Sequence, residues 1–235
     1  MPRHPPPRPH LCDQQDESPL QGASGLILPL LAEASIDAVI FDVGGVLYHW
    51  HPRYLYEKLI PDRDRLEWFC ANVVTPEWHF QHDAGRPAAE TTAELVSAFP
   101  EERDLIEAYV PRWLETLPGP VDGMIELVHA LADQGVPLYG ITNFSHEFWP
   151  RFASTEPAFA RFRDIIVSGE ERMVKPDPAI FALAKRRFPV DPARALFIDD
   201  RDDNIAAAEA AGYRGHVFTS ADRARAALTA LGLSL

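Results

Sequence analysis

Five short, largely apolar runs recur along the chain, and each of them ends at polar or small residues. Apolar runs of this length, without the alternation of a half-exposed strand, are typical of strands that are covered on both faces of a parallel sheet. The runs are Ala38–Phe41, Val136–Ile141, Ile165–Ser168, Ala195–Ile198 and Gly215–Thr219. The pattern therefore predicts five buried strands separated by longer connections.

The stretches between the later runs carry helix signals. Asp122 stands where it can cap a helix, and Asp177 stands before Pro178, a residue favoured at the first helical position. Ser220 can cap a last helix near the end of the chain. Strands that alternate with helices imply parallel strands joined by right-handed crossovers. We therefore predict an α/β fold built on a doubly wound parallel sheet.

The middle of the chain breaks this alternation. Residues 54–117 have helix-like spacing of apolar residues in several windows, lack strong strand signals and contain prolines that divide them into short helices. We predict that this stretch is an all-helical insert. The α/β core then consists of residues 36–53 and 118–235.

Residues 1–35 have the composition of an extension. Five of the first nine residues are proline, which favours an extended and solvated backbone. We expect disorder up to about Ser24 and either a short helix or an irregular tail over Leu26–Ala34.

Charge and composition exclude several classes of partner. The formal net charge of -13 argues against general nucleic-acid binding, which usually needs a basic face. Cys12 and Cys70 have no metal-site spacing, so a reducing compartment fits better than a disulfide framework. No apolar stretch is long enough to span a bilayer, and no signal-peptide pattern follows the N-terminus. We expect a soluble, cytoplasmic protein without nucleic-acid or membrane partners, as a monomer or homodimer.

Chemically useful side chains stand at or near the ends of four predicted strands. Asp42 follows the first run, Thr142 the second, and Asp199 and Asp200 follow the fourth, while Lys175 comes shortly after the third. In open α/β sheets, ligands bind at the carboxyl ends of the strands. The sequence therefore predicts that carboxylates, a hydroxyl and an ammonium group meet on one rim.

In these motifs the chain resembles the haloacid dehalogenase superfamily of phosphohydrolases over about Ile36 to Leu231. The four family motifs appear in order, and the helical insert matches the position of the family's helical cap. The closest branch by resemblance is that of glucose-1-phosphate phosphatase, which shares a glycine in the first motif. The motifs read Phe41–Leu47 (FDVGGVL), Ile141–Asn143 (ITN), Val174–Pro178 (VKPDP) and Phe197–Asp200 (FIDD) followed by Asn204.

The resemblance implies a covalent mechanism that depends on Mg²⁺. Asp42 would attack phosphorus and form an aspartyl-phosphate, which divides a hard hydrolysis into two steps. A cation must then offset the repulsion between this carboxylate and the phosphoryl group. Asp42, the backbone carbonyl of Gly44, and Asp200 are the metal ligands that the resemblance implies, with Asp199 as a ligand or as the group that orients metal-bound water.

Two further residues have implied roles in stabilising the transferred group. Thr142 would donate a hydrogen bond to a phosphoryl oxygen. Lys175 would neutralise Asp42 and the transferring group, which is the electrostatic stabilisation that phosphoryl transfer requires.

Gly44 departs from the usual family pattern. Most family phosphatases have a second aspartate at this position, which protonates the leaving oxygen and later activates water, a contribution of roughly 10²–10⁴ in rate. Three interpretations stay open. The substrate's leaving group needs little protonation, another group such as His49, His51 or His82 takes over, or the protein binds phosphate without turnover.

Three residues are candidates for substrate contact. Asn143 follows Thr142, and it either contacts substrate or caps the following helix. His49 lies in the region that matches the family's flap, and His82 lies in the insert segment that matches the lid.

We therefore expect a Mg²⁺-dependent phosphatase that hydrolyses a small phosphorylated metabolite, such as a sugar phosphate, through an aspartyl-phosphate. One alternative is a 2-haloacid dehalogenase, in which Asp42 attacks carbon, although this reaction leaves the pair Asp199 and Asp200 without a role. The other alternative is a non-catalytic, phosphate-binding regulatory protein.

Overall fold

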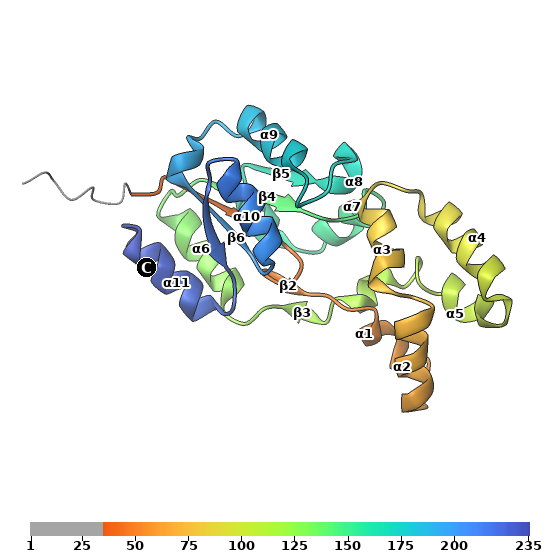
Figure 1. Cartoon of the computed structure of the whole chain (residues 1–235). Coiled ribbons are helices and arrows are strands. Elements are labelled where there is room, and N and C mark those ends of the chain that lie inside the picture. The colour runs from red at the N-terminus through yellow and green to blue at the C-terminus, as the bar shows by residue number, and fades with distance from the viewer. Residues whose placement is uncertain (1–34) are drawn as a thin grey trace, which may run out of the picture. The chain divides into compact units, whose positions relative to one another are not determined.

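The structure, a computed structural model, describes residues 35–235 (Figure 1). The expected disorder up to Ser24 and the expected helix over Leu26–Ala34 lie outside these residues. The described residues all belong to one compact unit. Among the described helices, none combines the length and the apolarity that a membrane crossing needs.

A five-stranded sheet forms the centre of the fold, in the order β5-β4-β1-β6-β7. Each pair of neighbouring strands is parallel, which confirms the predicted α/β class. The strands are β1 (Ala38–Phe41), β4 (Leu138–Thr142), β5 (Asp164–Val167), β6 (Ala195–Asp199) and β7 (Arg214–Val217). Each lies within a few residues of a run predicted from the sequence.

Both faces of the sheet are covered, which explains why the strands lack alternation. In β1, Val39 and Phe41 belong to one core cluster, whereas Ala38 and Ile40 belong to the other. Helices α6 (Met124–Asp133) and α11 (Ala221–Ala230) supply residues to the first cluster, and α9 (Pro178–Arg187) and α10 (Asp202–Ala210) supply the second. These alternate side chains of β1 are almost completely buried on both faces.

Most of the predicted helix starts are confirmed, and one is wrong. Asp177 accepts a hydrogen bond from the Ala179 amide at the start of α9, and Ser220 accepts one from the Arg223 amide at the start of α11. Asp122 does not cap α6. Gly123 takes that position with a φ of 78°, a left-handed conformation that glycine adopts without strain.

The stretch between the first and second strands of the sheet is helical. It leaves the core after β2 (Tyr48–His49) and returns at β3 (Gly119–Pro120), which pairs antiparallel with β2. Figure 1 shows its helices gathered on one side, away from α6 and α11. The stretch contains α1 (Arg53–Tyr56), α2 (Arg63–Asn72), α3 (Pro76–Asp83), α4 (Ala88–Ala98), α5 (Arg103–Glu107) and 3₁₀ turns at Pro100–Glu102 and Trp113–Thr116.

Three other short helices lie among the strands of the second half. They are α7 (Trp149–Ala153), α8 (Ser168–Glu171) and the 3₁₀ helix Pro157–Arg161, with a further 3₁₀ turn at Pro192–Arg194 before β6. Helix α8 follows β5 at the carboxyl end of the sheet and contacts α3 of the helical segment. This contact joins the helical stretch to the carboxyl end of the sheet.

Candidate active site

The carboxyl ends of β1 and β6 bring three carboxylates together. Asp42 directly follows β1, Asp199 is the last residue of β6, and Asp200 follows it. One oxygen from each lies within 4.8 Å of the others. The sequence-based expectation that these separated residues converge on one rim thus agrees with the geometry.

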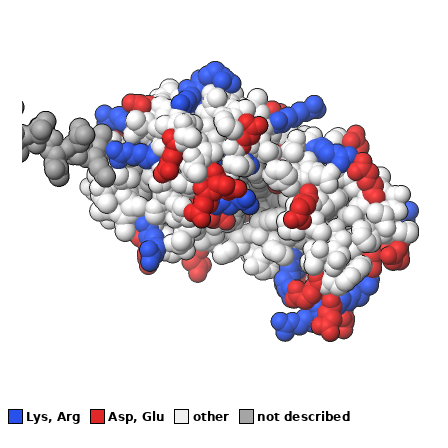
Figure 2. All heavy atoms as spheres, in the orientation of Figure 1, with Lys and Arg blue, Asp and Glu red and all other residues white. Residues whose placement is uncertain are grey.

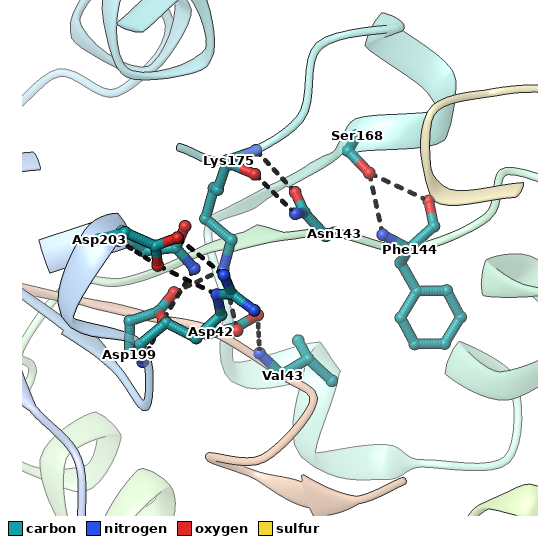
Figure 3. Close-up of polar contacts among 10 residues, drawn as sticks. Asp42, Val43, Asn143, Phe144, Ser168, Lys175, Asp199 and Asp203 are labelled. Atoms are coloured by element: carbon teal, nitrogen blue, oxygen red, sulfur yellow. Dashed lines mark hydrogen bonds and ion pairs between the residues drawn. The ribbon is translucent and has the colours of Figure 1, made fainter. Parts of the chain in front are cut away.

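Lys175 bridges two of these carboxylates (Figure 3). Its Nζ lies 2.9 Å from Asp42 Oδ2 and 2.7 Å from Asp199 Oδ2, and the lysine side chain is almost completely buried. Burial alone would lower the pKa of Lys175, but the two carboxylates outweigh this effect and raise it. The lysine is therefore a fixed positive charge beside Asp42.

Asp42 is a buried carboxylate in an acidic neighbourhood. Burial raises its pKa, the charge of Lys175 opposes this rise, and the charge of Asp199 adds to it. Asp42 Oδ1 accepts a hydrogen bond of 2.6 Å from the Val43 amide (Figure 3). A carboxylate can accept several hydrogen bonds, so Asp42 can still bind a further donor or a cation. Additional positive charge at this rim would favour the ionised form that can act as a nucleophile.

Asn143 fixes the loop that carries Lys175. Its Oδ1 accepts a hydrogen bond of 2.8 Å from the Lys175 amide, and its Nδ2 donates one of 3.0 Å to the Lys175 carbonyl (Figure 3). Asn143 also lines the cavity described below. Its side chain therefore holds the lysine backbone in place with both ends of its amide.

Asp199 and Asp200 have different surroundings, although they are neighbours in the chain. Asp199 is fully buried and accepts hydrogen bonds from Lys175 Nζ, Asn204 Nδ2 and the Arg201 amide. Asp200 is exposed at the rim. Asp199 is thus occupied in positioning protein groups, whereas Asp200 is accessible to a ligand.

The two glycines of the first motif meet different constraints. Gly45 has a φ of 76°, and a Cβ on it would lie 2.5 Å from Asp200 Oδ2, so the close approach of Asp200 requires glycine. Gly44 has no described atom within 4 Å of the position where its Cβ would stand. The site therefore has room for a side chain at position 44, which the chain leaves empty.

Thr142 ends β4 as a completely buried residue. Its Oγ1 has no hydrogen-bond partner within the described residues. Leaving a buried hydroxyl unpaired costs about 1–3 kcal/mol. The residue does not belong to the cavity lining but directly precedes Asn143, which does.

We call the carboxylates of Asp42, Asp199 and Asp200 the carboxylate rim, and the stretch between β2 and β3 the helical segment. A cavity of about 550 Å³ lies between them. Figure 2 shows acidic side chains beside a hollow in the surface. Asp42, Asp200 and Lys175 line the cavity on the sheet side. On the helical side the lining is largely aromatic, with Trp50, Phe80 and Trp113, and Phe144 adds to it from the loop after β4.

Helix α3 presents one face to this cavity. Pro76, Glu77, His79, Phe80 and Asp83 line it, and the spacing of three, four and seven residues from Pro76 to the last three of them is that of one helix face. Thr75 caps the helix by accepting a hydrogen bond from the Trp78 amide. The cap and the proline at the first position thus fix where the helix begins and which face it offers.

Two of the predicted substrate-contact residues do not line the cavity. His82 is fully buried, and its Nε2 lies 2.5 Å from Thr91 Oγ1 within the helical segment. His49 is an exposed residue of β2. The structure therefore gives no support to substrate contact by either histidine. Asp83 and His79 line the cavity instead, and their spacing of seven and three residues from Pro76, on one helix face, was the signal that could have identified them.

The carboxylate rim fits a divalent cation. The three carboxylates of Asp42, Asp199 and Asp200 together with the ammonium of Lys175 leave a formal charge of −2 at the rim. Carboxylate and carbonyl oxygens are the ligands that Mg²⁺ prefers, usually with several waters retained. The donor set of Asp42, Asp200 and the Gly44 carbonyl, which borders the cavity, is of this kind.

The chain is similar in sequence to two proteins named as phosphatases. The sesquiterpene phosphatase of Aspergillus oryzae is 25% identical over 184 residues, which is 76% of this chain and 87% of the relative. The validoxylamine A 7'-phosphate phosphatase of Streptomyces hygroscopicus subsp. limoneus is 31% identical over 133 residues, 54% of this chain and 62% of the relative.

Solved structures share the fold. A HAD-like family hydrolase from Porphyromonas gingivalis superposes with a TM-score of 0.63 at 22% identity, covering 84% of this chain and 98% of that one. A HAD family enzyme from Bacteroides thetaiotaomicron, solved with magnesium and inorganic phosphate, has a TM-score of 0.60 at 21% identity, covering 79% and 95%. The sequence of residues 36–212 matches the haloacid dehalogenase-like hydrolase family, so the protein is a hydrolase that belongs to this family.

Proposed function

We propose that this protein is a Mg²⁺-dependent phosphatase that works through an aspartyl-phosphate on Asp42. The observation that carries the proposal is the buried Lys175, held between Asp42 and Asp199 beside the exposed Asp200. This arrangement supports the proposal because a carboxylate that can act as a nucleophile, a fixed positive charge and carboxylates that can bind a metal lie at one end of the sheet. The phosphatase names of two relatives support the same reaction.

Each residue has a part that follows from its contacts. A carboxylate oxygen of Asp42 attacks phosphorus, while Lys175 offsets the negative charge of the transferring group. The unpaired hydroxyl of Thr142 donates to a phosphoryl oxygen, and Asn143 keeps the Lys175 loop in position. A bound Mg²⁺, held by Asp42, Asp200 and the Gly44 carbonyl, would supply the remaining positive charge that the dianion needs.

The substrate is a small phosphorylated metabolite, and we favour a sugar phosphate. A volume of about 550 Å³ suits a small ligand, and the helical segment covers it as a cap would. The glycine at position 44 supports a place near the glucose-1-phosphate phosphatase branch. The aromatic lining by Trp50 and Trp113 also suits an apolar alcohol phosphate, so this class belongs in the same test.

A phosphate-release screen over phosphorylated metabolites, with and without Mg²⁺, tests the proposal. The panel holds sugar 1-phosphates, their 6-phosphate isomers, isoprenoid alcohol monophosphates and an aryl phosphate. We expect Mg²⁺-dependent release that disappears in Asp42→Asn. Full activity in Asp42→Asn, or halide release from 2-haloacids without Mg²⁺, would overturn the proposal. Phosphate-analogue binding without any turnover would instead favour a regulatory protein.

A further inference from the structure

Asp83 is a buried carboxyl group in the wall of the cavity, and nothing above gives it a role. It is the last residue of α3 and is 8% exposed. Its Oδ1 has no hydrogen-bond partner within the described residues, and the nearest charged or titratable atom recorded is His79 Nε2 at 3.5 Å. Asp83 also lines the cavity, so its carboxyl group borders the space that a ligand would fill.

The end of helix α3 is built to stop at this residue. The Gly85 amide donates to the His82 carbonyl and the Arg86 amide donates to the Gln81 carbonyl, both at 2.9 Å. This pair of bonds closes the helix, and Gly85 has the positive φ of 89° that such an ending favours. Asp83 therefore occupies a defined position rather than a frayed helix end.

The backbone at Asp83 is also tied to the carboxyl end of the sheet. Ser168 Oγ donates a hydrogen bond of 2.6 Å to the Asp83 carbonyl and accepts one of 2.9 Å from the Phe144 amide. Ser168 directly follows β5, and Figure 3 shows its contact with Phe144 beyond the end of β4. A Cβ on Gly85 would lie 2.9 Å from the Gly169 carbonyl oxygen, so the two backbones touch there. These contacts hold Asp83 against the catalytic rim.

The surroundings favour the protonated form of Asp83. Burial raises its pKa well above the ordinary value, and the negative charge of Asp42 adds to the rise. The Lys175 ammonium and a hydrogen bond from the Ser145 backbone oppose it but do not outweigh it. A carboxylic acid that keeps its proton in a buried site can donate it to a ligand.

The histidine beside Asp83, His79, is also held in its neutral form. Burial and the neighbouring His82 lower the pKa of His79 well below its ordinary value, so its imidazole is neutral. His79 Nδ1 lies 2.8 Å from the Tyr109 hydroxyl. With Tyr109 as the donor, the imidazole hydrogen is on Nε2, the atom that faces Asp83 Oδ1. An N–H group on that side supports the carboxylate that forms when Asp83 gives up its proton.

We propose that Asp83 is the general acid and base of this phosphatase, placed on the helical segment in compensation for Gly44. This inference rests on the function proposed above. In the first step, Asp42 bonds to phosphorus, the bond from phosphorus to the leaving oxygen breaks, and the proton of Asp83 moves to that oxygen. The alcohol leaves, and Asp83 becomes a carboxylate.

In the second step the same group acts as a base. The Asp83 carboxylate takes a proton from water while the water oxygen bonds to phosphorus. The bond between phosphorus and Asp42 breaks, which releases inorganic phosphate and returns Asp42 and Asp83 to their starting states. Each turnover thus consumes one phosphate ester and one water and needs no further reactant.

The test compares Asp83→Asn with wild type on an alkyl phosphate and on p-nitrophenyl phosphate, whose leaving group needs no proton. We expect kcat/KM for the alkyl phosphate to fall by about 10²–10⁴ and that for the aryl phosphate to change much less. Glu102→Gln is the matched control, because Glu102 is a buried carboxylate of the helical segment that pairs with Arg65. This control should keep the ratio of the two rates.

A second readout separates catalysis from structure. Because Asp83→Asn lacks the base for the second step, p-nitrophenol should appear in a burst, and phosphate should accumulate on the peptide that contains Asp42. Gly44→Asp in the Asp83→Asn background should restore alkyl phosphate hydrolysis at least ten-fold, since position 44 has room for a side chain.

Equal losses on both substrates without phosphoenzyme, or no loss on the alkyl phosphate, would overturn the role of Asp83. The proposed phosphatase function would still stand in either case, because wild type would turn over substrate and Asp42→Asn would not. Failure of the function itself has a different signature. Wild type would then release no phosphate from any substrate in the screen.

Discussion

Lys175 is an ammonium group with almost no access to solvent, and its two carboxylate partners are buried with it. A buried ion pair contributes little net stability, but removing one partner leaves the other charge uncompensated. Both buried carboxylates therefore depend on this lysine for folding, and the Lys175 charge also lowers the pKa of Asp42.

Replacing Lys175 tests this dependence. We expect Lys175→Met to lower the free energy of unfolding by about 3–5 kcal/mol in the absence of metal and to remove phosphatase activity. Denaturant titration and a phosphate-release assay measure the two effects. Lys185→Met, on the exposed surface of α9, is the control and should leave both unchanged. A stable and active Lys175→Met variant would show that the bridge has neither role.

The raised pKa of Asp83 predicts that this group makes the protein less stable as pH rises. The pKa of Asp83 in the folded state is raised well above 3.8, its ordinary value in an unfolded chain, so the folded state keeps the proton to higher pH. Below pH 3.8 the group is protonated in both states and does not lower the free energy of unfolding. As pH rises above this value, the unfolded state ionises first, so the free energy of unfolding falls until the folded group also ionises. An amide at this position has no such loss.

Thermal unfolding of Asp83→Asn and wild type, with chelator present, checks this sign. We expect the two melting temperatures to be similar near about pH 4 and the variant to gain steadily towards about pH 8. Glu102→Gln removes a carboxylate that has an ion-pair partner, Arg65, and should show no such gain. A constant difference between Asp83→Asn and wild type across this range would mean that Asp83 is not held protonated.

At the scale of elements, helix α3 determines what the cavity wall contains. The face of Pro76, His79, Phe80 and Asp83 meets the cavity, and the N-cap Thr75 sets where the helix starts. The sequence predicted helices here but not this face. His79 and His82 are equivalent in residue type, and only the packing of α3 against the core decides that His79 borders the cavity.

Removing the cap of this helix should affect the site as well as stability. We expect Thr75→Ala to destabilise the protein by about 0.5–2 kcal/mol and to raise KM, because the first turn of α3 forms part of the wall. Asp62→Ala removes the cap of α2, which does not line the cavity. It should destabilise to a similar extent without a change in KM. Equal kinetic effects in both variants would contradict the role of α3.

At the scale of the whole molecule, local patterns predicted the sheet and the edge at which the carboxylates meet. The three central strands β4, β1 and β6 are buried along their whole length, and Asp42 and Asp199 lie at strand ends, where parallel topology brings them together. The cap of α6 was missed because Gly123, not Asp122, begins that helix. For His49, substrate contact stays a prediction. Its strand pairs with Gly119, a contact far along the chain that no local pattern encodes.

The distinction between local patterns and long-range contacts also applies to the candidate site. Strand ends identify Asp42 as the proposed nucleophile, because its place follows from sheet topology, and Lys175 comes eight residues after the end of β5. Asp83 belongs to a separate segment, and its place depends on the contact of Ser168 with the Asp83 carbonyl across 85 residues of chain. The proposed division of catalytic roles between the sheet and the helical segment therefore depends on the tertiary structure.

Trapping the covalent intermediate tests whether the rim performs phosphoryl transfer. The enzyme is mixed with Mg²⁺ and a phosphorylated substrate, quenched in acid within a turnover, digested and analysed by mass spectrometry. Phosphate should be attached to the peptide that contains Asp42, and it should be absent in Asp42→Asn and without Mg²⁺. Efficient turnover by wild type with no phosphate on this peptide, together with an active Asp42→Asn variant, would show that the rim does not work in this way.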